Sequence, residues 1–132
     1  MKYHKTITAL FFFAFLLGAY QFVFADPPIP RSEFIKMTEN ALDKMDELQS
    51  LLENGTSKME ARRAMSQLDA AMKKYDRYSG RETKEQAQIF INLMMAHYGF
   101  STLVTTGGNV GADLLEYKQK AVDLFMVYKD KK

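Results

Sequence analysis

The sequence predicts an all-α protein, an up-and-down antiparallel four-helix bundle that follows an N-terminal signal peptide. Apolar residues recur at intervals of three and four along the chain, which is the spacing of helices and not of strands. Turns that contain glycine divide this pattern into four segments of roughly 20 to 24 residues. No proline follows Pro30, so nothing interrupts the segments. Because the connections are short, neighbouring helices are expected to run antiparallel.

Residues 1–25 are typical of a secretory signal peptide. Lysines precede an uncharged apolar run, which closes on Val23-Phe24-Ala25, a small-x-small site for signal peptidase. The run is about 19 residues long, close to the roughly 20 that span a bilayer, so an uncleaved anchor is the alternative. Either way the rest of the chain is expected to be exported, periplasmic or extracellular, with membrane contact only through an uncleaved signal segment. The absence of cysteine excludes lipoprotein attachment and disulfide bonds.

Cleavage after Ala25 would leave an electrically neutral chain. Of the 18 Lys and Arg residues, Lys2 and Lys5 lie in the signal peptide, whereas all 16 Asp and Glu residues lie beyond it. Nucleic acid and anionic membranes are therefore not expected partners. The mature chain divides into a proline-rich leader over residues 26–31, expected to be extended or disordered, and a helical bundle domain over residues 32–132.

The first two helices have clear boundaries. The first is expected from near Ser32 to near Asn54, where Gly55 suits the left-handed position after a helix. The second begins at a capping box formed by Ser57 and Glu60 and ends at the "YSG" turn. The first helix is acidic and the second basic, so a weak attraction between them is expected. Their inner faces carry Ala41, Met45, Leu48 and Leu52 in the first helix and Met65, Leu68, Met72 and Tyr75 in the second.

The third helix, expected from about residue 82 to residue 105, is apolar on most of its sides. It begins at a second capping box, formed by Thr83 and Gln86. A helix that is apolar all round is usually buried by several neighbours or by a partner. Either the whole helix is core, or one side is surplus and binds a protein, forms a homo-oligomer or lines a ligand cavity. The candidate partner-binding residues are Ile89, Leu93 and Phe100.

The fourth helix is expected to begin after Asn109, a good N-cap residue, and to run to the lysine-rich end of the chain. The glycine-rich loop before it, residues 105–113, follows a helix and lacks both phosphate-binding glycine patterns, so it is expected to be a plain turn. The sequence Asn54-Gly55-Thr56 matches a glycosylation acceptor, which matters only in a host that glycosylates its exported proteins.

His97 is the only histidine beyond the signal peptide, and it shares a helix face with Met94. Such a pair raises the possibility of haem or Cu(I). Haem would need a second ligand from another helix, such as Met37, Met45 or Met65, and no C-x-x-C-H motif is present. Methionines at core spacing in all the helices are better explained by packing. We therefore expect no cofactor and no metal. His97 is expected to be a buried or half-buried structural histidine, and the alternative is that it is a cofactor ligand.

Catalysis is not expected either. A Ser-His-Asp or Cys-His site would have to use His97, and the chain has neither cysteine nor a G-x-S-x-G motif. A di-iron site needs glutamate three residues before histidine, where this chain has Met94. The carboxylates Asp43, Asp46 and Glu47 are interleaved with lysine and are expected to form a solvated surface.

These observations favour a non-enzymatic exported protein that binds another protein. Inhibitors, immunity proteins, chaperone-like factors and secretion accessories belong to this class, and a homo-oligomer is included. The alternative is a carrier of a small apolar ligand or of b-type haem in the core of the bundle, with His97 as the haem ligand.

Overall fold

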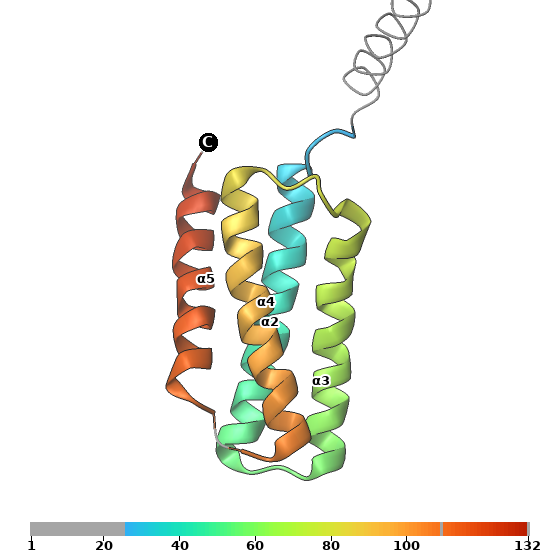
Figure 1. Ribbon diagram of the computed structural model, residues 1–132, viewed down its shortest axis with the longest axis vertical. Coiled ribbons are helices and arrows are strands. Elements are labelled where there is room, and N and C mark those ends of the chain that lie inside the picture. The colour runs from blue at the N-terminus through green and yellow to red at the C-terminus, as the bar shows by residue number, and fades with distance from the viewer. Residues whose placement is uncertain (1–25, 109, 132) are drawn as a thin grey trace, which may run out of the picture.

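The computed structural model describes residues 26–108 and 110–131, in which every regular element is a helix (Figure 1). The expectation of an all-α protein with four helices is confirmed for this part of the chain. The signal-peptide prediction concerns residues outside the described range. The elements are α2 (Arg31–Asn54), α3 (Lys58–Lys73), the 3₁₀ turn η1 (Lys74–Tyr78), α4 (Lys84–Thr106) and α5 (Ala112–Asp130).

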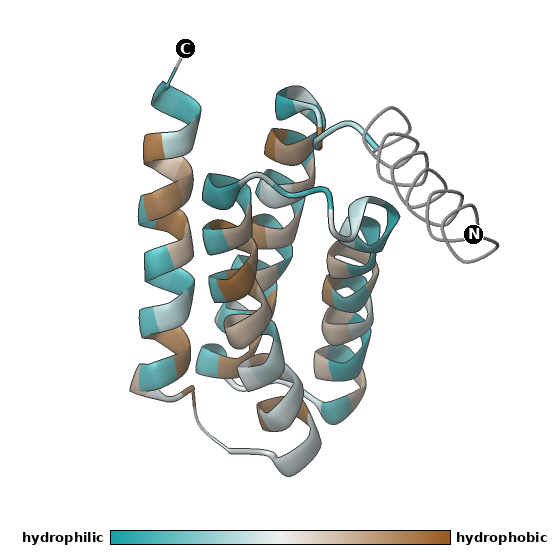
Figure 2. Cartoon of the chain, turned by 45° about the horizontal axis from the view of Figure 1, so that its top comes forward, coloured by the Kyte–Doolittle hydropathy of each residue, from teal (hydrophilic) through white to brown (hydrophobic). Residues whose placement is uncertain are grey.

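The four helices lie side by side around one hydrophobic core. Consecutive helices contact each other, and α5 also contacts α2 (Figure 1). Figure 2 shows hydrophobic residues in each of these helices, interleaved with hydrophilic ones, as expected of helices that each bury one face. The largest fully buried apolar side chains come from α2, α3, η1 and α4, and they are Phe34, Met45, Leu48, Leu68, Tyr75, Ile89, Leu93 and Phe100.

The N-terminal caps of α3 and α4 differ in completeness. At α4 both halves of the predicted capping box form, because the Thr83 hydroxyl accepts from the Gln86 amide and the Gln86 side chain accepts from the Thr83 amide. At α3 the Ser57 hydroxyl accepts from the Glu60 amide, but the Glu60 carboxylate accepts from the Thr56 hydroxyl at 2.6 Å. The predicted box at α3 is therefore only half formed.

Two boundaries differ from the sequence-based expectation. The second helix tightens into the 3₁₀ turn η1 over its last residues. The last helix begins at Ala112 with Gly111 in the N-cap position, so the predicted start after Asn109 is too early; Asn109 itself is outside the described residues. Gly107, with φ of 75°, ends α4 in the left-handed conformation that glycine adopts without strain.

The leader is held against the bundle. Ile29 is buried, its amide donates to the Arg81 carbonyl at 3.3 Å, and its carbonyl accepts from Gln86 Nε2 at 3.2 Å. Arg81 Nε also donates to the Pro27 carbonyl at 2.6 Å. The leader was expected to be extended or disordered, and the structure shows it ordered against the bundle. Ile29 is buried in an apolar site, and the residues next to Ile29 in the sequence do not predict this.

Two lysines of α5 form ion pairs with acidic residues of α2. Asp46 pairs with Lys118, and Glu39 lies 3.7 Å from Lys129. The described part of the chain contains no ion pair between α2 and α3, so no direct ion pair accompanies the expected attraction between these two helices. Instead, Asp46 and Glu39 of α2 pair with lysines of α5. Each exposed pair contributes only about 0.2–1 kcal/mol, and burial of apolar surface dominates the stability.

Within the same described range, no helix has both the length and the apolar character needed to cross a bilayer.

Candidate functional site

The outward side of α4 is an exposed apolar strip. Ile91, Met95 and Tyr98 follow each other at steps of four and three residues, so they share one face of the helix. Their exposed fractions are 57%, 42% and 72%, respectively. We call these three residues the α4 strip. Single exposed apolar residues are ordinary on protein surfaces, but three in a row on one helix face are not.

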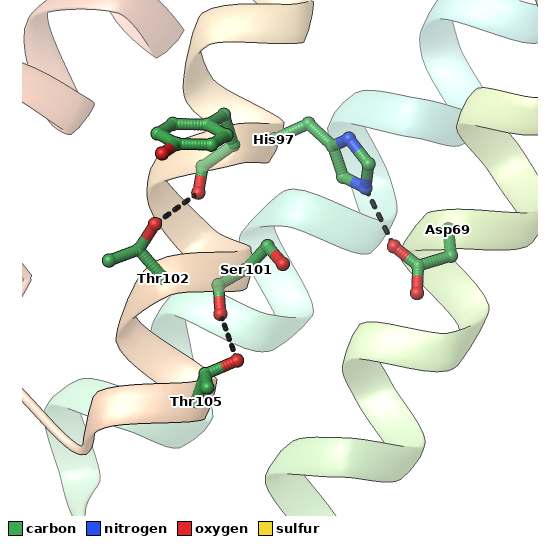
Figure 3. A network of polar contacts seen from close by, with 6 residues as sticks. Asp69, His97, Ser101, Thr102 and Thr105 are labelled. Carbon is green, nitrogen blue, oxygen red and sulfur yellow. Dashed lines mark hydrogen bonds and ion pairs between the residues drawn. The ribbon is translucent and has the colours of Figure 1, made fainter.

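Charged residues are absent around the α4 strip along the chain. From Gln86 to Ala112 the sequence contains no Asp, Glu, Lys or Arg, whereas charged residues make up 26% of the whole chain. The hydroxyls that continue this face are bonded to the helix itself, because Thr102 donates to the Tyr98 carbonyl at 3.0 Å and Thr105 to the Ser101 carbonyl at 2.9 Å (Figure 3). This face of α4 therefore offers apolar side chains, and the hydroxyls of Thr102 and Thr105 are already engaged.

The predicted partner-binding residues lie on the opposite side of α4. Ile89 is 1% exposed, and Leu93 and Phe100 are fully buried. They pack in the core and present no surface to a partner, so the expectation that they form an interface is corrected. The apolar surplus of α4 is real, but it lies on the α4 strip. Periodicity missed this because both sides of the helix are apolar at helical spacing.

A second feature is a groove of about 410 Å³ between α3 and α4. His97 reaches from α4 across to Asp69 on α3, with 2.7 Å between Nε2 and Oδ1 (Figure 3). The His97 side chain is 28% exposed, which agrees with a half-buried histidine. Sequence reasoning did not identify Asp69 as its partner, because the two residues lie on different helices. The groove is lined by Asp69, Met72, Lys73, Asp76, Phe90, Met94 and His97.

The haem interpretation requires His97 and a methionine from another helix to face the same space. The candidates Met37, Met45 and Met65 are buried in the core, and none of the three lines the groove at His97, whereas Met72 of α3 does. Residues 26–108 and 110–131 also contain no group of three His, Cys, Asp or Glu side chains that could hold a metal ion.

A third feature is a groove of about 340 Å³ at the end of the molecule where α2 ends and α3 begins. Lys58 and Arg62 line it on one side and the hydroxyls of Thr105 and Thr106 on the other. Both threonine hydroxyls already donate to the helix, Thr105 to the Ser101 carbonyl at 2.9 Å and Thr106 to the Thr102 carbonyl at 2.8 Å. This groove shows no buried polar group that lacks a partner.

Elsewhere in residues 26–108 and 110–131, every buried side-chain polar atom has a hydrogen-bond partner. The Tyr75 hydroxyl lies 2.7 Å from Thr38 Oγ1 in the core. Burial raises the pKa of Tyr75 well above its usual range, because the phenolate would lose its hydration. Tyr75 therefore stays neutral at physiological pH and is unsuited to accept a proton.

Comparison of the chain with protein-family models, curated proteins and solved structures finds no match.

Proposed function

We propose that the protein is an exported, non-enzymatic binding protein that docks another protein on the α4 strip, with its helices arranged as an up-and-down antiparallel four-helix bundle. The observation that carries this proposal is the exposure of Ile91, Met95 and Tyr98 on a helix that has no charged residue beyond Glu85. Protein interfaces are depleted of charge at their centre and enriched in tyrosine and methionine. Tyr98, the most exposed of the three, is the natural anchor residue.

The packing of α4 supports this role. The opposite side of α4 is packed against the core through Ile89, Leu93 and Phe100, so the strip sits on a helix that the core holds in place. A rigid surface loses little conformational entropy when a partner binds. Val127, 56% exposed on α5, lines a groove of about 90 Å³ together with Gln88 of α4 and the ion-paired residues Glu85 and Lys131.

The alternative function, a carrier of haem or of a small apolar ligand, has less support. Its proposed ligand His97 faces a surface groove and is engaged by Asp69. The largest buried side chains come from four successive elements and pack in the core, where a core ligand would have to lie.

Site-specific photo-crosslinking tests the proposal. A photoreactive phenylalanine analogue is placed at Tyr98 in the chain produced by its own host, and the matched control carries it at Met59 of α3, which has the same exposed fraction of 72%. We expect a defined crosslinked protein from position 98 and none from position 59. A second copy of the chain is one admissible product.

Binding must also depend on the strip. For this test the photoreactive analogue is placed at Met95. Ile91→Glu and Tyr98→Glu should each abolish the crosslink from this position, because a charge cannot be buried at an apolar interface without a large desolvation cost. Met59→Glu should leave the crosslink unchanged. Equal crosslinking from positions 59 and 98, or crosslinking that survives both strip variants, contradicts the proposal.

A further inference from the structure

We propose that the groove between α3 and α4 is a binding site for a soft monovalent metal ion, Cu(I), with Met72, Met94 and His97 as ligands. This site is separate from the α4 strip, because it faces α3 and uses other side chains.

The first step concerns the imidazole of His97. Its Nε2 lies 2.7 Å from Asp69 Oδ1, so the Nε2–H tautomer donates to the carboxylate and leaves the lone pair on Nδ1 free. Figure 3 shows the second ring nitrogen on the side of the ring away from Asp69. Histidines that bind metals are commonly held in this way, with a carboxylate on one nitrogen and the metal on the other.

The second step concerns the two thioethers. Asp69 pairs with His97 at one point of the groove. Met72, three residues after Asp69, and Met94, three residues before His97, line the same groove. On antiparallel helices, moving three residues forward from Asp69 and three back from His97 reaches the same level, so Met72, 7% exposed, and Met94 line the groove at one level. Met94 is 48% exposed and has the freedom to turn its sulfur inward.

The third step concerns the choice of metal. Thioether sulfur and imidazole are ligands that Cu(I) accepts and that Mg²⁺ and Ca²⁺ avoid. The described residues offer no group of three imidazole, thiol or carboxylate ligands, which zinc would require. The charged groups that line the groove are Asp69, Asp76 and Lys73, and their net charge of about −1 suits a single positive charge.

The test uses the exported protein and two probes, Ag(I) as a redox-stable soft ion and Cu(I) under anaerobic conditions in competition with a chromophoric chelator. We expect one equivalent of either ion to bind and the ¹⁵N resonance of His97 Nδ1, not Nε2, to shift. An excess of Zn(II) should not displace the ion. Absence of binding, or a stoichiometric shift of Nε2 alone, overturns the proposal.

Matched variants separate this site from nonspecific binding to methionine. Met94→Leu and His97→Gln should each weaken binding by about tenfold or more, and Asp69→Asn by about 10–100-fold through loss of the orienting carboxylate. Met126→Leu, at a methionine 51% exposed on α5, should bind as the unchanged protein does. Thermal unfolding shows that the variants are folded. Affinity that is unchanged in Met94→Leu and His97→Gln would overturn the proposal even if the protein binds silver.

Discussion

At the scale of single residues, Gln86 connects more of the molecule than any motif indicates. It is buried, its Oε1 accepts from the Thr83 amide at 3.0 Å, and its Nε2 donates to the Ile29 carbonyl and, at 2.9 Å, to the Tyr128 hydroxyl. The capping box predicted the contact with Thr83. The other two contacts join the leader and the end of α5, and no sequence pattern announces contacts between residues so far apart along the chain.

Replacing Gln86 with leucine should lower the free energy of unfolding by about 2–4 kcal/mol, because it leaves buried polar partners without a hydrogen bond. Gln88→Leu, two residues away at an exposed position, should change it by less than about 0.5 kcal/mol. Urea unfolding of both variants measures the difference. Equal effects would mean that the network around Gln86 contributes nothing specific.

Tyr75 predicts a loss of stability at high pH. Its pKa is raised in the folded state by burial, so the neutral form is favoured and its contribution is complete below the ordinary pKa of tyrosine, about 10. Above that pH the unfolded chain releases the phenolic proton and the folded chain keeps it, so stability falls by up to about 1.4 kcal/mol per pH unit.

The variant Tyr75→Phe isolates this effect from the other groups that titrate at high pH. It should cost about 1 kcal/mol at neutral pH, because Thr38 loses its partner, and should unfold with a shallower loss of stability between about pH 10 and 12. If the free energy of unfolding changed with pH in the same way in the wild-type chain and in Tyr75→Phe, the Tyr75 hydroxyl would be accessible to water.

At the scale of elements, α4 shows where sequence reasoning succeeds and where it stops. Its existence, its capping box and its glycine stop follow from the residues at its ends. Its orientation about its own axis does not, because apolar residues occupy both the buried and the exposed sides. The packing of Leu114 of α5 against Gly99 helps to decide which side faces inward, and that contact depends on the tertiary fold.

Substitutions on the two sides of α4 should therefore differ sharply. Leu93→Ala and Phe100→Ala should each cost about 2–5 kcal/mol of unfolding free energy, because they leave cavities in the core. Tyr98→Ala should stay within about 0.5 kcal/mol, because its side chain is 72% exposed. Chemical denaturation curves of the three variants are sufficient. The reverse order would place the α4 strip in the core and the predicted interface residues on the surface.

The close approach of α4 and α5 at Gly99 gives a further prediction. A Cβ atom at this position would lie 2.9 Å from Leu114 Cδ1 and 3.3 Å from Leu114 Cβ, and the second of these atoms cannot turn away. Gly99→Ala should be destabilising by about 1 kcal/mol, since the overlap exceeds the gain in helix propensity. In the background of Leu114→Ala the same change should become stabilising. A destabilisation that persists in that background would assign the effect to the backbone of α4.

At the scale of the whole molecule, the sequence predicted an all-α protein because its four segments without proline carry apolar residues at helical spacing, and packing the helices together buries them. The candidate sites could not be predicted in the same way. In the groove, Asp69 of α3 pairs with His97 of α4. The leader is held by a buried site for Ile29 that segments distant in the sequence form. Such contacts are set by the relative positions of helices, which local spacing does not determine.

The end of the molecule where α2 begins and α5 ends contains several contacts between residues that are far apart in the sequence. The Arg31 guanidinium donates to the carbonyls of Tyr128 and Lys129 at 3.2 and 2.7 Å, and Lys131 lies 2.9 Å from Glu85. Together with the leader they tie the start and the end of the described chain to α4. In a chain without cysteine, these noncovalent contacts join the two ends of the described range.

The most direct test of a protein-binding α4 strip is native mass spectrometry of the chain purified from its host. The wild-type chain should appear with the added mass of a bound protein or of a second copy. The double variant Ile91→Glu/Tyr98→Glu, with unchanged thermal unfolding, should appear as a single chain, whereas Met59→Glu should retain the added mass. A wild-type chain that travels alone, or a complex that survives the double variant, would contradict binding at this face.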